Sequence, residues 1–357
     1  MWKVGLVGTG FWSEKHLKAW RRIPGVEIHA LCNRSPEKLM NKAREFGVPE
    51  ERCFRTLEDM LRHADIDIVD IVTGPETHER LVALAAEAGK HILCQKPFAP
   101  SLEEAERIVE SADRHGVRLM VTENWRWLAP FQTLKRLLDE GVAGELRMVR
   151  YAHSDLFTVR MSPDKFLPQP FLTKMPRLIF YEMGAHWFDT WRFLFGEPER
   201  LYAEMRRHSP YVAGEDAGVV TLSHGRFYGI LDVSWATRRD LTEPLEPDAV
   251  LAHHKESVTI DGDKATIILD VYGNIFVIDD AGNKTAVAEG LTLDHEESHF
   301  RLQSHFIECL ETGREFQTSG ADNLKTLRLA FSAYRSAEEH AAVRLDGGDA
   351  AESGGRR

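Results

Sequence analysis

The chain has 357 residues, which predicts two domains, each large enough to bury a hydrophobic core. Its 45 basic and 56 acidic residues give a net charge of −11, which argues against a nucleic-acid-binding protein with a broad basic face. No apolar run approaches the roughly 18 residues of a membrane-spanning helix, and the N-terminus lacks the apolar core of a signal peptide. The four scattered cysteines do not form a disulfide framework. We therefore expect a cytoplasmic protein that partners neither nucleic acid nor membrane.

Strand and helix patterns alternate through residues 1–122. The strongest strand covers residues 66–72, whose near-continuous apolar run is typical of a buried parallel sheet. Further strands are predicted at residues 4–7, 26–32, 91–94 and 117–121. Helices are predicted at residues 11–23, from Ser35 onward, and at 77–88 and 101–115. This alternation predicts a doubly wound parallel α/β sheet, a Rossmann domain, over residues 1–122.

The pattern changes after residue 123, where alternating strands separated by turn residues become common. Strands are predicted at residues 148–151, 218–223, 227–234, 258–260, 266–269 and 275–278. Helices are predicted at residues 130–140, 182–195, 299–312 and 323–340. We expect an α+β domain with a mostly antiparallel sheet over residues 123–345, followed by a mobile tail at 346–357 that is rich in Gly, Ala and Asp.

A glycine-rich turn, Gly8-Thr9-Gly10-Phe11-Trp12-Ser13, lies directly between the first strand and the first helix. Gly8 permits a tight turn, and Gly10 lets the backbone approach a pyrophosphate at the helix N-terminus. The third glycine of the usual pattern is replaced by Ser13. A glycine turn in another α/β fold is the alternative, but the place of this turn in the first βαβ unit favours a dinucleotide site.

The second strand is followed by Asn33-Arg34-Ser35, where a carboxylate would hold the ribose of NAD and repel a 2′-phosphate. Asn33 can bind a ribose hydroxyl without repelling phosphate, and Arg34 and Lys38 can meet a phosphate. The alternative is that Arg34 is an ordinary surface residue. This turn favours NADP over NAD and leaves NAD open.

Two further turns end neighbouring strands, and ligands of open α/β sheets bind at these carboxyl ends. They are Thr73-Gly74-Pro75-Glu76-Thr77-His78 and Cys94-Gln95-Lys96-Pro97. Pro97 restricts the backbone of Lys96, whose ammonium can point at the oxygen of a reacting carbon. Together the four turns predict a cofactor site formed by Gly8, Thr9, Gly10, Phe11, Trp12, Asn33, Arg34, Lys38, Thr73, Gly74, Pro75, His78, Gln95, Lys96 and Pro97.

The segment from Glu182 to Asp189 places Glu182, His186 and Asp189 on one face of a predicted helix. A carboxylate one turn from a histidine can orient its ring and stabilise the imidazolium. Metal binding and a purely structural helix face are the alternatives, but no third ligand is evident. His295, His299 and His305, and the pair His253-His254, also have ligand-like spacing, and we assign them to solvated faces. We predict no metal site.

These motifs together resemble the glucose–fructose oxidoreductase/inositol dehydrogenase family, Gfo/Idh/MocA, over most of the chain. The resemblance rests on Gly8-x-Gly10 with His16, on Thr73 to His78, on residues 85–93, on Lys96-Pro97, on Glu182-x-Gly184-x-His186-x-x-Asp189 and on residues 333–337. It implies a Rossmann domain followed by an α/β domain whose open sheet often mediates dimers or tetramers. Two residues depart from the family pattern. The usual Glu-Lys-Pro is Gln95-Lys96-Pro97, and the usual Asp of the second motif is Glu182.

The resemblance implies an NAD(P)-dependent oxidoreductase of a sugar, sugar derivative or polyol. It makes His186 the general acid/base, Lys96 the residue that polarises the substrate oxygen, and Glu182 the residue that tunes His186. The substrate would contact Lys96, Glu182, His186 and Asp189, and the pocket would be shaped by Glu123, Trp125, Arg126, Arg177 and Tyr181. Losing the carboxylate at position 95 removes a charge that would help to keep Lys96 protonated.

Two other functions remain open. One is a hydrolase or epimerase that oxidises and reduces its substrate with bound NAD, and the other is a sensor that keeps the cofactor fold without turnover. Lys96 and His186 argue against the sensor, whereas Gln95 keeps it possible. We expect a homodimer or homotetramer.

Overall fold

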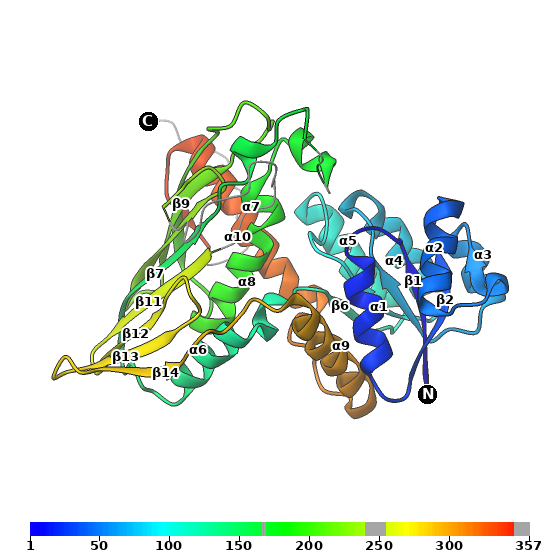
Figure 1. The fold of residues 1–357 in the computed structure, drawn as a ribbon, viewed down its shortest axis with the longest axis horizontal. Coiled ribbons are helices and arrows are strands. Elements are labelled where there is room, and N and C mark those ends of the chain that lie inside the picture. Colours follow the sequence, from blue (N-terminus) through cyan, green and yellow to red (C-terminus); the bar gives the residue numbers. More distant parts are fainter. Residues whose placement is uncertain (166, 168, 240–254, 346–357) are drawn as a thin grey trace, which may run out of the picture. The chain divides into compact units, whose positions relative to one another are not determined.

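The computed structural model describes residues 1–165, 167, 169–239 and 255–345 (Figure 1). The predicted tail at 346–357 and the pair His253-His254 lie outside these residues. The described chain forms two compact units. The first contains residues 1–133, 181–190 and 292–328, and the second contains residues 134–180, 191–291 and 329–357, so far as they are described.

The first unit contains a six-stranded sheet in the order β3-β2-β1-β4-β5-β6, with every neighbouring pair parallel. This is the strand order of a dinucleotide-binding Rossmann fold, and its order reverses between β1 and β4. The predicted parallel sheet is therefore confirmed. The strands are β1 (Trp2–Val7), β2 (Val26–Cys32), β3 (Cys53–Phe54), β4 (Ile68–Ile71), β5 (His91–Cys94) and β6 (Leu119–Val121).

The helices of this sheet begin where the sequence provides caps. Ser35 accepts a hydrogen bond from the backbone of Lys38, and Ser101 accepts one from Glu104, as expected for two N-caps. The short strand β3 and helix α3 were not predicted. The helices are α1 (Ser13–Arg22), α2 (Pro36–Phe46), α3 (Leu57–His63), α4 (His78–Glu87) and α5 (Leu102–Arg114).

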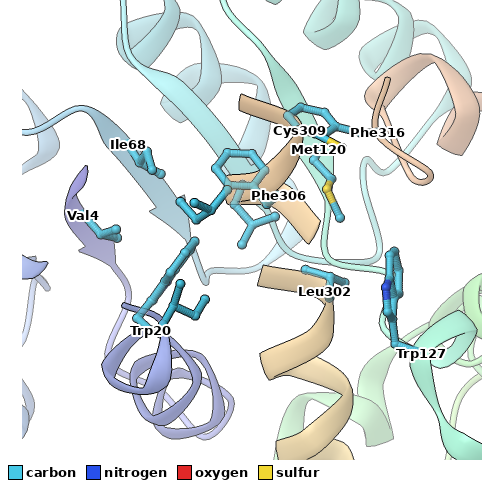
Figure 2. Packing of buried hydrophobic residues seen from close by; sticks show 12 residues of the cluster. Val4, Trp20, Ile68, Met120, Trp127, Leu302, Phe306, Cys309 and Phe316 are labelled. Atoms are coloured by element: carbon cyan, nitrogen blue, oxygen red, sulfur yellow. The ribbon is translucent and has the colours of Figure 1, made fainter. Parts of the chain in front are cut away.

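Helix α9 (His295–Thr312), far along the chain, packs against α1 in the first unit (Figure 1). Its N-cap is Asp294, whose carboxylate accepts hydrogen bonds from the backbone of Glu296 and Glu297. Figure 2 shows the hydrophobic cluster that α9 shares with the sheet and α1. The labelled residues of this cluster are Val4, Trp20, Ile68, Met120, Trp127, Leu302, Phe306, Cys309 and Phe316.

The second unit contains a nine-stranded sheet in the order β14-β13-β12-β11-β7-β10-β9-β8-β15. Within this sheet, as far as its residues are described, β7–β10 is the one parallel pair, so the predicted mostly antiparallel sheet is confirmed. Strands β8, β14 and β15 were not predicted. The strands are β7 (Leu146–Ser154), β8 (Arg200–Arg206), β9 (Ala217–Ser223), β10 (Tyr228–Ser234), β11 (Lys255–Gly262), β12 (Ala265–Leu269), β13 (Ile275–Asp279), β14 (Lys284–Ala288) and β15 (Val343–Arg344).

The remaining helices differ from the predictions mainly at their ends. The predicted helix at 182–195 is interrupted at Met183, so that a short α7 precedes α8. These helices are α6 (Ala129–Asp139), α7 (Ile179–Glu182), α8 (Gly184–Phe195) and α10 (Gly320–Glu339), and a 3₁₀ turn, η3, covers Trp125–Trp127. None of the helices in the described part of the chain combines the length and the apolar character needed to cross a membrane.

Candidate active site

The turn after β1 has the backbone that a dinucleotide requires. Gly8 has φ +97°, and a Cβ there would lie 2.2 Å from the carbonyl oxygen of Val72, so only glycine fits. A Cβ on Gly10 would meet no protein atom within 4 Å. Ser13 donates from Oγ to the carbonyl of Gly10 at 2.6 Å, which fixes the turn at the start of α1. Space beside Gly10, at the N-terminus of a ten-residue helix, fits a pyrophosphate.

The turn after β2 shows that Asn33 is already engaged within the protein. Its Nδ2 donates to Oγ1 of Thr9, and its Oδ1 accepts from the backbone of Ser35 at 3.0 Å. Arg34 and Lys38 are exposed. Asn33 and Thr9 thus fix one another next to the first turn, and the side chains of Arg34 and Lys38 face solvent.

The turn after β4 is tied to the turn after β5 by His78. The ring of His78 is fully buried, with Nδ1 2.9 Å from the carbonyl oxygen of Phe98 and Nε2 3.1 Å from that of Thr73. Burial lowers the pKa of His78, so the ring is held neutral. Both ring nitrogens face the backbone, and the cofactor contact of His78 remains a prediction. His78 positions the turn of Thr73, Gly74 and Pro75.

Lys96 lies at the end of β5, and its ammonium is held by Glu182. Nζ donates to Oε1 of Glu182 at 2.6 Å and to the backbone carbonyl of the same residue at 3.0 Å. Lys96 is only 8% exposed, so the carboxylate compensates much of the cost of burying the charge. The peptide bond between Lys96 and Pro97 is cis. Because the carboxylate of Glu182 pairs with Lys96, Glu182 supplies the negative charge that position 95 lacks.

His186 receives its carboxylate from a residue 63 positions earlier in the chain. Nδ1 of His186 forms a short hydrogen bond with Oε1 of Glu123, and both side chains are buried. Burial raises the pKa of Glu123 to about 8, although the nearby charge of Lys96 lowers it. The carboxylate bonded to the ring is that of Glu123, whereas Glu182, which was predicted to tune His186, pairs with Lys96.

Trp125 fixes the plane of the same imidazole. Its ring stacks on His186 with centroids 4.8 Å apart and an interplanar angle of 9°, and on its neighbour Phe131 at 5.9 Å and 16°. Trp125 is only 1% exposed and supports the ring of the histidine. The place of Trp125 in a substrate pocket remains a prediction.

Arg126 and Asp189 form a buried structural pair. Nε and Nη2 of Arg126 donate to the two oxygens of Asp189 at 2.6 and 2.8 Å, and Nη2 also reaches Asp322 at 2.8 Å. Oδ1 of Asp189 accepts a further hydrogen bond from Thr326 at 3.2 Å. Asp189 is fully buried. These contacts join η3 to α8 and α10, and the substrate contacts of Asp189 and the pocket role of Arg126 remain predictions.

The other two residues predicted to line the pocket have internal contacts. Tyr181 is buried and donates from its hydroxyl to the carbonyl oxygen of Ala99 at 3.0 Å. Arg177 belongs to the second unit, where its guanidinium lies 5.5 Å from the ring of Phe331 and 5.2 Å from that of Tyr334. Neither contact supports a role in substrate binding.

The histidines of α9 belong to an aromatic layer. His299 stacks on Trp12 with centroids 6.0 Å apart, and its Nδ1 contacts the backbone carbonyl of His295 at 2.7 Å. The prediction that these histidines lie on a solvated face is wrong for His299, which is buried. Within the described residues, no three or more His, Cys, Asp or Glu side chains are grouped so as to hold a metal ion.

The first unit thus places an ammonium, a histidine–carboxylate pair and a dinucleotide turn on one scaffold. The charges of Lys96 and Glu182 both act on Glu123, so the two ion pairs are electrostatically coupled. A histidine held by a carboxylate can exchange a proton near neutral pH, and an ammonium can stabilise an alkoxide. With a Rossmann sheet, these groups define a dehydrogenase that uses NAD or NADP.

Comparison with known proteins agrees with this class. Residues 2–123 match the family described as an oxidoreductase family with an NAD-binding Rossmann fold, and residues 131–268 match the GFO/IDH/MocA C-terminal domain. The chain is 38% identical over 352 residues to a D-apiose dehydrogenase of Paraburkholderia graminis, covering 96% of this chain and 89% of that protein. A D-apiose dehydrogenase of Rhizobium rhizogenes is 35% identical over 344 residues, with 94% and 95% covered.

A solved structure gives the same result. The crystal structure of an oxidoreductase from Agrobacterium radiobacter, in complex with NAD+, L-tartaric acid and magnesium, superposes with a TM-score of 0.86 at 33% identity and covers 96% of this chain and 98% of that one. The chain belongs to the GFO/IDH/MocA family of oxidoreductases. It is a sugar or polyol dehydrogenase with a nicotinamide cofactor.

Proposed function

We propose that this chain oxidises D-apiose or a small aldose closely related to it, with Lys96 and His186 as the catalytic residues. The two D-apiose dehydrogenases, at 38% and 35% identity over nearly the whole chain, support the substrate. The observation that carries the mechanism is the geometry of the site. The ammonium of Lys96 is held by Glu182, and the ring of His186 by Glu123, within one compact unit.

Lys96 polarises the substrate oxygen in this mechanism. An ammonium has three N–H donors. Among the described residues, Lys96 uses two of them on Glu182, one on Oε1 and one on the backbone carbonyl. One donor remains for the hydroxyl oxygen of the substrate, where it stabilises the negative charge that develops as the proton leaves. The contacts with Glu182 direct the ammonium.

His186 takes the hydroxyl proton. Its Nδ1 is held by Glu123 and its plane by Trp125, and we assign the proton transfer to Nε2. The carboxylate of Glu123 stabilises the imidazolium that forms, as in other histidine–carboxylate pairs. Oxidation thus breaks the O–H bond toward His186, and the carbon loses its hydrogen with both bonding electrons.

The cofactor would be held by the turn from Gly8 to Trp12, by the helix N-terminus of α1, and by the turns of Asn33 and Thr73. When bound, the nicotinamide supplies the acceptor of the hydride. We propose that NADP binds at least as well as NAD, because no carboxylate follows β2 and Arg34 and Lys38 are exposed. The ratio of the two dissociation constants, measured by fluorescence quenching, tests this preference.

The test of the function is absorbance of the reduced nicotinamide with a panel of D-apiose, other aldoses and myo-inositol. We expect a steady rise with D-apiose or a related aldose, and a smaller one with myo-inositol. Product formed without a net change in absorbance would indicate a hydrolase or epimerase with transient redox. Cofactor binding without product from any sugar would indicate a sensor. Either result would contradict the proposal.

The remaining organisation is proposed with the function. We propose that residues 1–122 bind the dinucleotide and that residues 123–345 bind substrate and mediate a homodimer or homotetramer. The exposed Val219 and Tyr228 of the nine-stranded sheet support an assembly role for its open face. Light scattering after gel filtration tests it. Cysteines 32, 53, 94 and 309 are unpaired, which supports a cytoplasmic protein.

A further inference from the structure

A buried chain of hydrogen bonds connects the centre of the Rossmann sheet to the backbone of Lys96. The carboxylate of Asp70, in β4, lies 2.9 and 3.0 Å from Nδ1 of His16 in α1. Nε2 of His16 lies 3.1 Å from Nε2 of Gln95, and Oε1 of Gln95 lies 2.7 Å from the backbone nitrogen of Lys96. Asp70 and His16 are fully buried, and Gln95 is 7% exposed.

The directions of these bonds determine where the protons lie. The backbone N–H of Lys96 is a donor, so the oxygen of the Gln95 amide must face it, and the amide N–H₂ must face His16. Nε2 of His16 therefore accepts, and Nδ1 carries the proton that is donated to Asp70. Asp70 also accepts from Nε1 of Trp20 at 2.7 Å. Every bond is satisfied when His16 is neutral with its proton on Nδ1.

A second buried histidine and one carboxylate lie beside His16. His299, from α9, lies with its ring centroid 5.0 Å from that of His16. Burial lowers the pKa of His299 well below the usual range, whereas the hydrogen bond to the backbone of His295 raises it. The ammonium of Lys96 is a positive charge in the site. Asp70 is the one negative side chain bonded to His16 among the described residues.

We propose that Gln95 is a positioning residue, which couples a neutral His16 to the backbone of Lys96 and thereby holds the catalytic ammonium in place. The inference rests on the proposed role of Lys96. An amide suits this position because it accepts at one end and donates at the other without charge. A carboxyl group there makes both bonds only if it, or His16, holds one additional proton.

The matched variants are Gln95→Glu, which keeps the shape, and Gln95→Met, which removes both hydrogen bonds. Turnover of Gln95→Glu relative to the original protein should be nearly normal at low pH. It should fall by about tenfold per pH unit above the pKa of the additional proton, because the introduced carboxylate then faces an imidazole lone pair. Gln95→Met should turn over at least about tenfold more slowly at every pH, with its cofactor dissociation constant within a few-fold.

Two readouts do not depend on turnover. The melting temperature of Gln95→Glu relative to the original protein should fall as pH rises, because the folded state binds the additional proton more tightly. Nitrogen-15 shifts of labelled histidine, with the signals of His16 assigned by their loss in His16→Gln, should show a protonated Nδ1 and an unprotonated Nε2.

The proposal is overturned if Gln95→Met turns over within twofold of the original protein. It is also overturned if, from pH 6 to 9, neither the turnover ratio nor the difference in melting temperature between Gln95→Glu and the original protein changes. A protonated Nε2 on His16 would also overturn it. Failure of the proposed function is distinguishable, because normal turnover in Lys96→Ala would refute the role of Lys96 while leaving the histidine shifts and the melting profile as expected.

Discussion

Replacing Glu123 with Gln separates catalysis from stability. An amide at this position can accept the hydrogen bond from Nδ1 of His186, so the ring keeps its orientation. It cannot carry the negative charge that stabilises an imidazolium. We therefore expect Glu123→Gln to lower turnover by about 10²-fold or more above pH 8, where the carboxylate of Glu123 is ionised, with cofactor affinity within a few-fold.

The same substitution should stabilise the fold at high pH. Burial raises the pKa of Glu123 from 4.5 to about 8, which corresponds to about 5 kcal/mol against the ionised form at about 1.4 kcal/mol per unit. A group with a raised folded pKa contributes its full stability below the unfolded pKa and loses it as pH rises through the folded value. The hydrogen bond to His186 offsets part of this cost, so the stabilisation gained by Glu123→Gln is smaller than this value.

The assay is the difference in melting temperature between Glu123→Gln and the original protein, followed from pH 4.5 to 9 beside turnover. The difference should increase in favour of the variant between pH 4.5 and about 8. A matched control is Glu256→Gln, which changes a buried carboxylate bonded to His153 at 2.5 Å in the second unit. It should leave turnover per folded molecule unchanged. A Glu123→Gln variant with near-normal turnover, or with a pH-independent difference in melting temperature, would refute the reasoning.

Three further substitutions test other parts of the site. Gly10→Val should lower cofactor affinity steeply and leave the melting temperature unchanged. Gly8→Ala should lower the melting temperature, because its Cβ would lie 2.2 Å from a carbonyl oxygen. Equal effects of the two substitutions would contradict this account. Arg34→Ala should weaken NADP more than NAD in fluorescence titration, and equal losses would show that Arg34 does not contact the 2′-phosphate. Asp189→Asn should destabilise the fold by about 3 kcal/mol without a selective rise in KM, because it removes the charge that pairs with the buried guanidinium of Arg126. A large rise in KM in a stable protein would instead indicate that Asp189 binds substrate.

The parallel sheet could be predicted because its strands are apolar runs that end in glycine or turn residues. Strand β8 could not be predicted in this way, because it buries two side chains, Leu201 and Ala203, and has a charged residue at each end. Strand β14 is exposed almost throughout and is defined by pairing with β13. Backbone pairing, which leaves no pattern in the side chains, decides such strands.

The candidate site was predicted as a set of turns, but the partners within it were not. Spacing along one helix suggested that Glu182 holds His186, whereas the interruption at Met183 ends that register and Lys96 takes the carboxylate. Glu123 lies 63 residues from His186, so no local pattern could reveal the pair. The buried network of Asp70 was not predicted, although a charged residue inside the apolar run of β4 needs donors and could have indicated it.

Turnover and cofactor affinity of Lys96→Ala and His186→Ala, measured beside the original protein with its best sugar, test the central claim most directly. Each variant should lose about 10²–10⁴-fold in turnover while its cofactor dissociation constant stays within a few-fold, and the double variant should lose much less than the product of the two effects. Near-normal turnover in His186→Ala or in Lys96→Ala would contradict the account.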